Sequence, residues 1–247
     1  PELISKHGAI PGIKVDKGAK PLAGSIEETV TEGLDGLRER LKEYYDLGAR
    51  FTKWRAVYNI GEKYPSSQSI KSNAHALARY AALVQEAKMV PIVEPEVLMD
   101  GIHTIDTSFD VTDRTLRTVF DQLEKHNVDL EGIVLKPNMV LSGYNCENQA
   151  SVEEVAQKTL ECLTNNVPSK VPGIAFLSGG QSDELATLHL NEINKHDTNW
   201  NVTFSYGRAL QQSALKIWAG KSENIEAAQE SLLSRAKANS LATTASL

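Results

Sequence analysis

The sequence predicts an α/β protein built on a parallel sheet, and three observations carry this prediction. Short apolar runs rich in β-branched residues alternate with segments of helical period along the chain. Six such strand–helix units follow one another, and no low-complexity linker or change of composition separates them. Uninterrupted βαβα order favours one parallel sheet, either doubly wound or closed as a barrel. A closed barrel of this class has eight units in about 250 residues, so six units leave both forms open.

The expected strands are apolar runs of the length typical of buried parallel strands. They cover residues 9–15, 50–57, 89–94, 132–136, 173–177 and 202–205.

The expected helices carry apolar side chains on one face. One starts near Ser66, one follows Thr112, and one is opened by Ser151, which forms a capping-box pattern with Glu154. The others are expected at residues 33–47, 182–194, 209–218 and 224–239. Gly48 stands where a glycine often ends a helix. We expect one domain over residues 1–247, with a C-terminal helix and tail at residues 224–247.

Composition narrows the class of protein. A net charge of -6 and a pI near 5.6 argue against nucleic acid as the main partner. No apolar run approaches the roughly 18 residues of a membrane span, so no membrane association is expected. The presence of only two cysteines, Cys146 and Cys162, argues against a disulfide framework and favours a reducing compartment such as the cytoplasm. The start at Pro1 is neither a signal peptide nor an initiator methionine, and we expect a fragment of a longer chain.

Charged residues occur at the ends of four consecutive expected strands, where burial on both faces favours apolar ones. They are Lys14 with Asp16, Lys53 with Arg55, Glu94 with Glu96, and Lys136. The strand period of two puts the members of each pair on a common face. Burying an unpaired charge costs several kcal/mol, so this recurrence favours a functional site over solvated strand ends. Active sites form at the carboxyl ends of barrel strands.

The charge balance of this candidate site favours an anionic ligand, most simply a phosphate. Five cations (Lys14, Lys53, Arg55, Lys136 and Arg208) face three carboxylates (Asp16, Glu94 and Glu96). Two glycine-containing segments precede expected helices, Ser178-Gly179-Gly180-Gln181-Ser182 and Tyr206-Gly207-Arg208. Glycine allows backbone N–H groups to approach an anion, and a helix N-terminus favours negative charge. The string LSGGQ also occurs in ATP-binding-cassette ATPases, but the phosphate-binding loop that those proteins require is absent.

Lys136 is a candidate Schiff-base nucleophile. Burial and a neighbouring cation such as Lys53 favour the neutral, nucleophilic form of a lysine amine. A carboxylate such as Glu94 can move the protons that imine formation requires. The six histidines and two cysteines lack metal-ligand spacing, so neither a metal nor another cofactor is expected.

Six strings of the sequence, in order, resemble class I fructose-1,6-bisphosphate aldolases. They are GIKVDKG at 12–18, KWR at 53–55, VPIVEPE at 90–96, LKPNM at 135–139, FLSGGQS at 176–182 and FSYGRAL at 204–210. The resemblance implies a (β/α)8 TIM barrel, of which six βα units are present. It also implies reversible, metal-independent cleavage of fructose 1,6-bisphosphate to dihydroxyacetone phosphate and glyceraldehyde 3-phosphate, in a homotetramer.

The resemblance assigns each site residue a role. Lys136 forms the imine, Glu94 is the general acid and base, and Glu96 assists it. Lys53 lies beside the imine, and Asp16 orders the surrounding lysines. Lys14 and Arg55 bind the end of the substrate that carries the C6 phosphate. The C1 phosphate is bound by Ser178, Gly179, Gly207 and Arg208.

The chain also departs from the family. The first two βα units and a C-terminal tyrosine are missing, and we expect the isolated polypeptide to be poorly active. A plastid origin stays open because a transit peptide would precede Pro1. Two alternatives remain. One is a transaldolase-like or deoxyribose-phosphate-aldolase-like Schiff-base barrel, which would handle a single phosphate. The other is a non-catalytic aldolase fragment that acts as a binding partner.

Overall fold

A computed structural model describes all residues, 1–247, and contains one six-stranded parallel sheet in the order β1-β4-β5-β6-β7-β8. The strands are β1 (Gly12–Lys14), β4 (Phe51–Tyr58), β5 (Val90–Val97), β6 (Val134–Leu135), β7 (Gly173–Phe176) and β8 (Asn201–Phe204). The six expected strands are therefore confirmed. Neighbours in the sheet follow chain order, and β1 and β8 form its two edges. This is the strand order of a (β/α)8 barrel, represented by six of its units.

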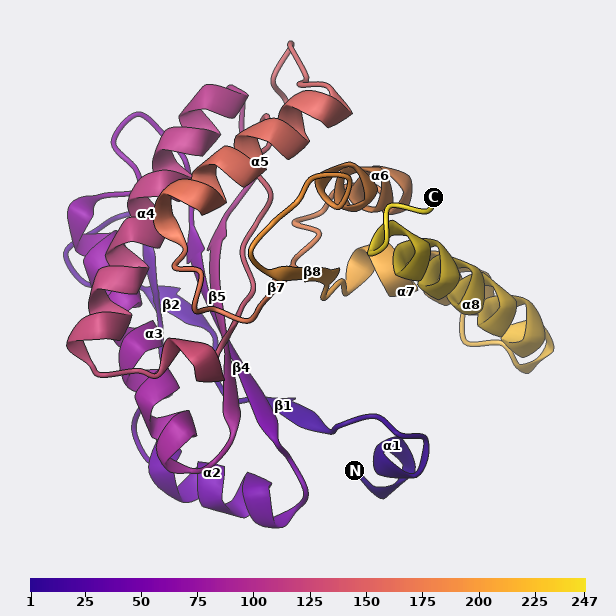
Figure 1. Ribbon diagram of the computed structural model, residues 1–247, viewed down its shortest axis with the longest axis horizontal. Helices are drawn as coiled ribbons and strands as arrows, with labels where there is room; N and C mark the ends of the chain where they lie inside the picture. Colours follow the sequence, from indigo (N-terminus) through magenta and orange to yellow (C-terminus); the bar gives the residue numbers. More distant parts are fainter.

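Helices follow the strands as the periodicity predicts. Their bounds are α1 (Glu2–Lys6), α2 (Leu37–Asp46), α3 (Ser67–Glu86), α4 (Ile105–Lys125), α5 (Val152–Asn166), α6 (Asp183–Ile193), α7 (Arg208–Trp218) and α8 (Ile225–Ala242). Two short 3₁₀ turns, Leu130–Gly132 and Ser222–Asn224, complete the set. In Figure 1, α2 to α5 cover one face of the sheet, and α7 and α8 lie together beyond β8. No helix combines the length and apolar character needed to cross a bilayer.

Side-chain caps explain where several helices begin. The Ser66 hydroxyl accepts from the backbone N–H of Ser69 at the start of α3, and Ser151 accepts from that of Glu154 at the start of α5. The sequence predictions for two other helices were wrong. The fourth helix begins at Ile105, not after Thr112, because Thr104 caps it. The second begins at Leu37, not near residue 33, because Gly36 is left-handed with φ 64° and stays outside the helix.

The strand bounds also differ from expectation. The first strand is limited to Gly12–Lys14, whereas β5 continues to Val97, so that Glu94 and Glu96 lie within it. The sequence predictions missed the helix α1 and an antiparallel hairpin formed by β2 (Ala19–Pro21) and β3 (Thr29–Thr31). The hairpin sits outside the main sheet, next to β4 and α3; β3 and β4 are joined by the Thr31 hydroxyl, which donates to the Arg55 carbonyl.

The alternation of β4 decides which side chains enter the core. Thr52, Trp54, Ala56 and Tyr58 are fully buried, whereas Lys53 and Arg55 lie on the other face. The Trp54 ring packs against Tyr80 of α3, with ring centroids 5.4 Å apart. The Tyr80 hydroxyl bonds to that of Thr52 at 2.8 Å and donates to the Ile92 carbonyl at 3.2 Å. The helix-facing side of the sheet is thus fixed by packing, and the charged side chains are left for the opposite face.

Candidate active site

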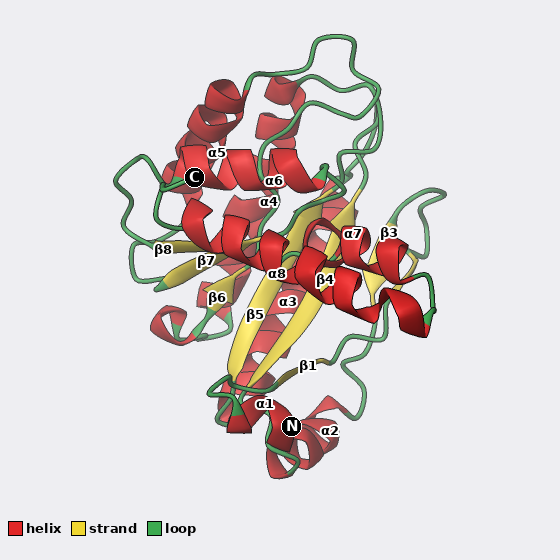
Figure 2. Cartoon of the chain, turned by 90° about the vertical axis from the view of Figure 1, so that its right-hand side faces the viewer, coloured by secondary structure: helices red, strands yellow, loops and turns green.

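The register of β4, β5 and β6 brings the charged residues of three strands together. Arg55 pairs with Glu94 across β4 and β5, and Val93 pairs with Leu135 across β5 and β6. Lys136 directly follows β6, and its backbone N–H donates to the Val93 carbonyl at 2.8 Å. The sheet therefore places Lys136 beside Glu94. Figure 2 shows these neighbouring strands fanning out in parallel.

The Glu94 carboxylate lies between two lysines. Its Oε1 is 3.1 Å from Lys136 Nζ, and its Oε2 is 2.9 Å from Lys53 Nζ. The Glu94 side chain is 4% exposed, and those of Lys136 and Lys53 are 13% and 21% exposed. Both contacts are ion pairs. A buried carboxylate at this distance from an amine can exchange a proton with it.

Asp16 joins this pair of lysines to the first strand. Its Oδ1 is 2.6 Å from Lys14 Nζ, and its Oδ2 is 3.8 Å from Lys53 Nζ. The same carboxylate accepts from the backbone N–H groups of Gly18 at 3.1 Å and Arg55 at 3.2 Å. Its side chain is 2% exposed. We call Lys14, Asp16, Lys53, Glu94 and Lys136 the lysine–carboxylate network.

A second ion pair lies beside the network. The Arg55 guanidinium donates through Nε to Glu96, one strand away. Glu96 is buried, while Arg55 is 42% exposed. Burial lowers the pKa of Arg55, but the hydrogen bond and charge of Glu96 raise it, and the net effect is a raised pKa. Arg55 therefore stays charged at the open side of the site.

The glycine loop, residues 178–181, connects β7 to α6. Ser178 is buried, and Gly179 and Gly180 have φ of 59° and 90°, values that favour glycine. After the next strand, β8, Gly207 precedes α7 and Arg208 is the first residue of that helix. A Cβ placed on Gly180 would lie 3.2 Å from Arg208 Nη2, so the Arg208 side chain lies over the glycine loop. The loop and Arg208 form a compact group of backbone donors and one cation.

The predicted site residues therefore fall into two groups along the sheet. The network and the Arg55–Glu96 pair occupy β1, β4, β5 and β6, whereas Ser178, Gly179, Gly207 and Arg208 follow β7 and β8. No direct ion pair or hydrogen bond joins the two groups. Sequence reasoning missed Tyr144, whose hydroxyl donates to the Gly179 carbonyl at 3.1 Å. An isolated tyrosine in a loop after β6 carries no signal of its own.

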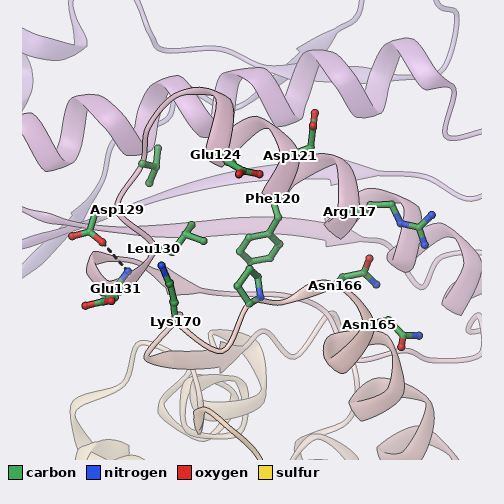
Figure 3. A pocket seen from close by; sticks show the side chains of 12 residues that line it. Arg117, Phe120, Asp121, Glu124, Asp129, Leu130, Glu131, Asn165, Asn166 and Lys170 are labelled. Carbon is green, nitrogen blue, oxygen red and sulfur yellow. Dashed lines mark hydrogen bonds between the residues drawn. The ribbon is translucent and has the colours of Figure 1, made fainter.

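A groove of about 620 Å³ lies elsewhere, between the end of α4 and the segments that lead into β6 and β7 (Figure 3). Phe120, Asn166 and several charged side chains line the groove. One of these, Asp121, forms an ion pair with Lys125, which does not line the groove. None of the predicted site residues lines this groove. It lies at the amino ends of the strands, the end that serves stability in barrels, so we place the candidate site at the other end. No cluster of three or more His, Cys, Asp or Glu side chains is arranged to hold a metal ion.

Comparisons with known proteins identify the family to which this chain is similar. The family model described as "Fructose-bisphosphate aldolase class-I" matches residues 1–247. A "Probable fructose-bisphosphate aldolase class 1" of Xanthomonas axonopodis is 60% identical over 98% of this chain and 73% of its own length. A cytosolic and a chloroplastic fructose-bisphosphate aldolase of Arabidopsis thaliana are 53% and 52% identical, each over 98% of this chain, and over 62% and 60% of their own lengths.

The fold comparison gives the same family. The fructose-bisphosphate aldolase of Plasmodium falciparum, solved in a complex with TRAP and a small-molecule inhibitor, superposes with a TM-score of 0.97 at 50% identity. The match covers 99% of this chain and 72% of that one.

Proposed function

The chain belongs to the class I fructose-bisphosphate aldolase family, and we propose that it cleaves and forms the C3–C4 bond of fructose 1,6-bisphosphate with Lys136 as its nucleophile. The observation that carries this proposal is the position of the Lys136 amine, nearly buried and 3.1 Å from the Glu94 carboxylate. This geometry provides a nucleophile and a proton acceptor within reach of one carbonyl group.

The reaction begins at the substrate ketone. Glu94 takes a proton from the Lys136 ammonium, and the neutral amine attacks C2. A second proton moves from the nitrogen to the former carbonyl oxygen, which gives the carbinolamine. Glu94 then returns its proton to the carbinolamine hydroxyl, so that water leaves and a protonated imine remains. The carboxylate can do this because its Oε1 lies 3.1 Å from the Lys136 amine. Lys53, on the other side of Glu94, keeps a positive charge next to the leaving hydroxyl.

The protonated imine then accepts the electron pair of the C3–C4 bond. A base takes the proton from the C4 hydroxyl as glyceraldehyde 3-phosphate leaves, and an enamine remains on Lys136. Protonation at C3 and hydrolysis of the imine release dihydroxyacetone phosphate and restore the amine. The network supports these steps by holding three ammonium groups around two buried carboxylates, Asp16 and Glu94.

The two ends of the substrate carry phosphates, and each end of the site offers cations. We assign the C1 phosphate to Ser178, Gly179, Gly207 and Arg208, because backbone N–H groups at the start of α7 and a guanidinium favour an anion. We assign the C6 phosphate to Lys14 and Arg55, whose side chains are about half exposed at the other side. Glu96 holds Arg55 in place.

Our proposals for the oligomeric state and the cellular compartment rest on membership of the family alone. We propose a homotetramer that acts without a metal or other cofactor. Relatives occur in the cytosol and in the chloroplast, and we propose the cytoplasm for this protein, with the plastid as the alternative.

Reductive trapping tests the proposal. The protein is incubated with dihydroxyacetone phosphate, reduced with borohydride and digested, and the modified peptide is identified by mass spectrometry. We expect one adduct, on Lys136, and none in a Lys136→Met variant. Lys42→Met, which changes an exposed lysine of α2, is the matched control. Labelling spread over surface lysines, or unchanged in Lys136→Met, would refute a Schiff-base site at this position.

A further inference from the structure

Tyr144 lies outside every motif of the sequence, yet it contacts the glycine loop. Its hydroxyl donates to the Gly179 carbonyl, and a Cβ placed on Gly180 would lie 1.7 Å from this hydroxyl oxygen. The same Cβ would lie 3.2 Å from Arg208 Nη2. Tyr144 and Arg208 therefore cover Gly180 together, and the space of its missing side chain is filled.

Tyr144 is itself firmly held. Its backbone N–H donates to the Met99 carbonyl at 2.8 Å, and the N–H groups of Gly143 and Asn145 donate to the carbonyls of His103 and Gly101 at 2.8 and 2.9 Å. The segment after β6 is thus bonded to the segment after β5. Through its side chain, Tyr144 extends this connection to the segment after β7.

The opposite side of the glycine loop is fixed from α6. The Gln181 side chain bonds to Nδ1 of His189 at 2.5 Å, and the Gln181 backbone N–H donates to the Ser178 carbonyl at 3.0 Å. The peptide between Gly179 and Gly180 lacks such an anchor apart from Tyr144. Glycine tolerates both signs of φ, so this peptide can rotate by half a turn at little steric cost unless a partner holds its carbonyl.

The orientation of this peptide matters for an anion. A carbonyl oxygen carries a partial negative charge, and a rotated Gly179 carbonyl would repel a phosphate on the loop. Burial raises the pKa of the Tyr144 phenol, with a smaller opposing effect of Arg208. The hydroxyl is therefore protonated at neutral pH and can donate to the carbonyl.

We propose that Tyr144 is a positioning residue for phosphate recognition, which fixes the Gly179–Gly180 peptide so that the glycine loop and Arg208 present only donors to the substrate. This inference rests on the proposed assignment of the C1 phosphate to the loop. It concerns recognition of the phosphate and leaves the chemistry at Lys136 unchanged.

The test compares a ligand that has a phosphate with one that lacks it. Imine trapping on Lys136 is measured against the concentration of dihydroxyacetone phosphate and of dihydroxyacetone, in the parent, in Tyr144→Phe and in Tyr44→Phe, a control on α2. Tyr144→Phe keeps the ring and removes the hydroxyl. We expect its half-saturating dihydroxyacetone phosphate concentration to rise roughly three- to tenfold, the effect of one hydrogen bond. The value for dihydroxyacetone and the labelling at saturation stay unchanged.

The outcomes separate this inference from the proposed function. Equal half-saturating concentrations of dihydroxyacetone phosphate in Tyr144→Phe and the parent, with Lys136 labelled in both, would overturn the role of Tyr144 and leave the Schiff-base site standing. An equal rise for both ligands would show a general structural role and also overturn it. Absence of labelling in the parent would refute the proposed function. In that case, the role of Tyr144 is tested by calorimetric titration of the parent and of Tyr144→Phe with inorganic phosphate. Weaker phosphate binding by Tyr144→Phe supports the inference. Equal affinity of the two proteins, or no binding to the parent, contradicts it.

Discussion

Lys53 and Lys136 bind opposite oxygens of one buried carboxylate, at 2.9 and 3.1 Å from Glu94. The two lysines come from β4 and from the end of β6, and Glu94 lies on β5 between them. One negative charge thus serves two ammonium groups. If Lys136 gives up its proton, the charge of Glu94 remains balanced by Lys53.

We predict that Glu94→Gln lowers kcat roughly 10²- to 10⁴-fold, the usual contribution of a general acid–base group. The amide cannot relay protons between the substrate and the Lys136 amine. Steady-state cleavage assays measure kcat, and Glu86→Gln, an exposed partner of Arg38, is the control. A kcat within twofold of the parent would remove Glu94 from the proton transfers.

Asp16→Asn is expected to lower the free energy of unfolding by roughly 1–3 kcal/mol, because the buried carboxylate accepts two backbone N–H groups and the amide can accept through only one oxygen. The change removes the charge that faces Lys14 and Lys53, while an amide oxygen still accepts from a backbone N–H. Urea denaturation followed by circular dichroism gives the value. In Asp46→Asn the lost pair with Lys42 is exposed, and a loss below about 1 kcal/mol is expected. Equal losses in both variants would contradict a structural role of the buried carboxylate.

The two phosphate ends are expected to respond differently to the loss of a guanidinium. Arg55→Met should raise KM for fructose 1,6-bisphosphate roughly tenfold or more and leave KM for fructose 1-phosphate unchanged, since a hydrogen bond to a charged group is lost only at the C6 end. Arg208→Met should raise both. Arg117→Met, on the outer face of α4, serves as the control. If Arg55→Met affects both substrates equally, the C6 assignment is wrong.

His189 makes stability depend on pH. Burial lowers the pKa of this histidine to about 4, from 6.5 in the unfolded chain. Between these two pKa values the histidine is protonated in the unfolded chain and neutral in the folded one. The contribution of His189 to the free energy of unfolding is therefore complete above pH 6.5 and is lost as the pH falls toward 4. The shift corresponds to about 3 kcal/mol.

His189→Gln should therefore flatten the stability profile of the protein between pH 6.5 and 4. Urea denaturation at a series of pH values measures this, and the difference from the parent isolates the histidine from titrating carboxylates. His196→Gln changes a histidine just beyond α6 as a control. A His189→Gln profile parallel to that of the parent would contradict a buried, neutral histidine.

Much of the fold follows from the sequence because apolar periodicity and hydroxyl caps are local signals. Ser66 and Ser151 mark the starts of α3 and α5, and the six strands lie close to their expected positions. The hairpin of β2 and β3 was missed because short segments such as Ala19–Pro21 lack an apolar alternation. The start of α4 was missed because four of its first six residues are polar; the two apolar ones, Ile105 and Phe109, lie about one turn apart, and Thr104 caps the helix.

The residues of the candidate site could be predicted from the sequence for a different reason. The strand period placed Lys53 with Arg55 and Glu94 with Glu96, and the structure confirms that these charges pair across β4 and β5. Which cation meets which carboxylate depends on the register, which the sequence does not specify. Tyr144 could not be found at all, because its contact with Gly179 joins two loops that are distant along the chain.

The distribution of the network over β4, β5 and β6 has a consequence for the order of events during refolding. No single strand–helix unit holds both the amine and its carboxylate, so the nucleophile acquires its environment only once distant parallel strands have paired. Local helices form within microseconds, whereas such long-range pairing is slow. In a stopped-flow refolding experiment, the helical circular dichroism signal should therefore recover before Lys136 can be trapped with borohydride. The delay between the two signals measures how long β6 takes to dock on β5.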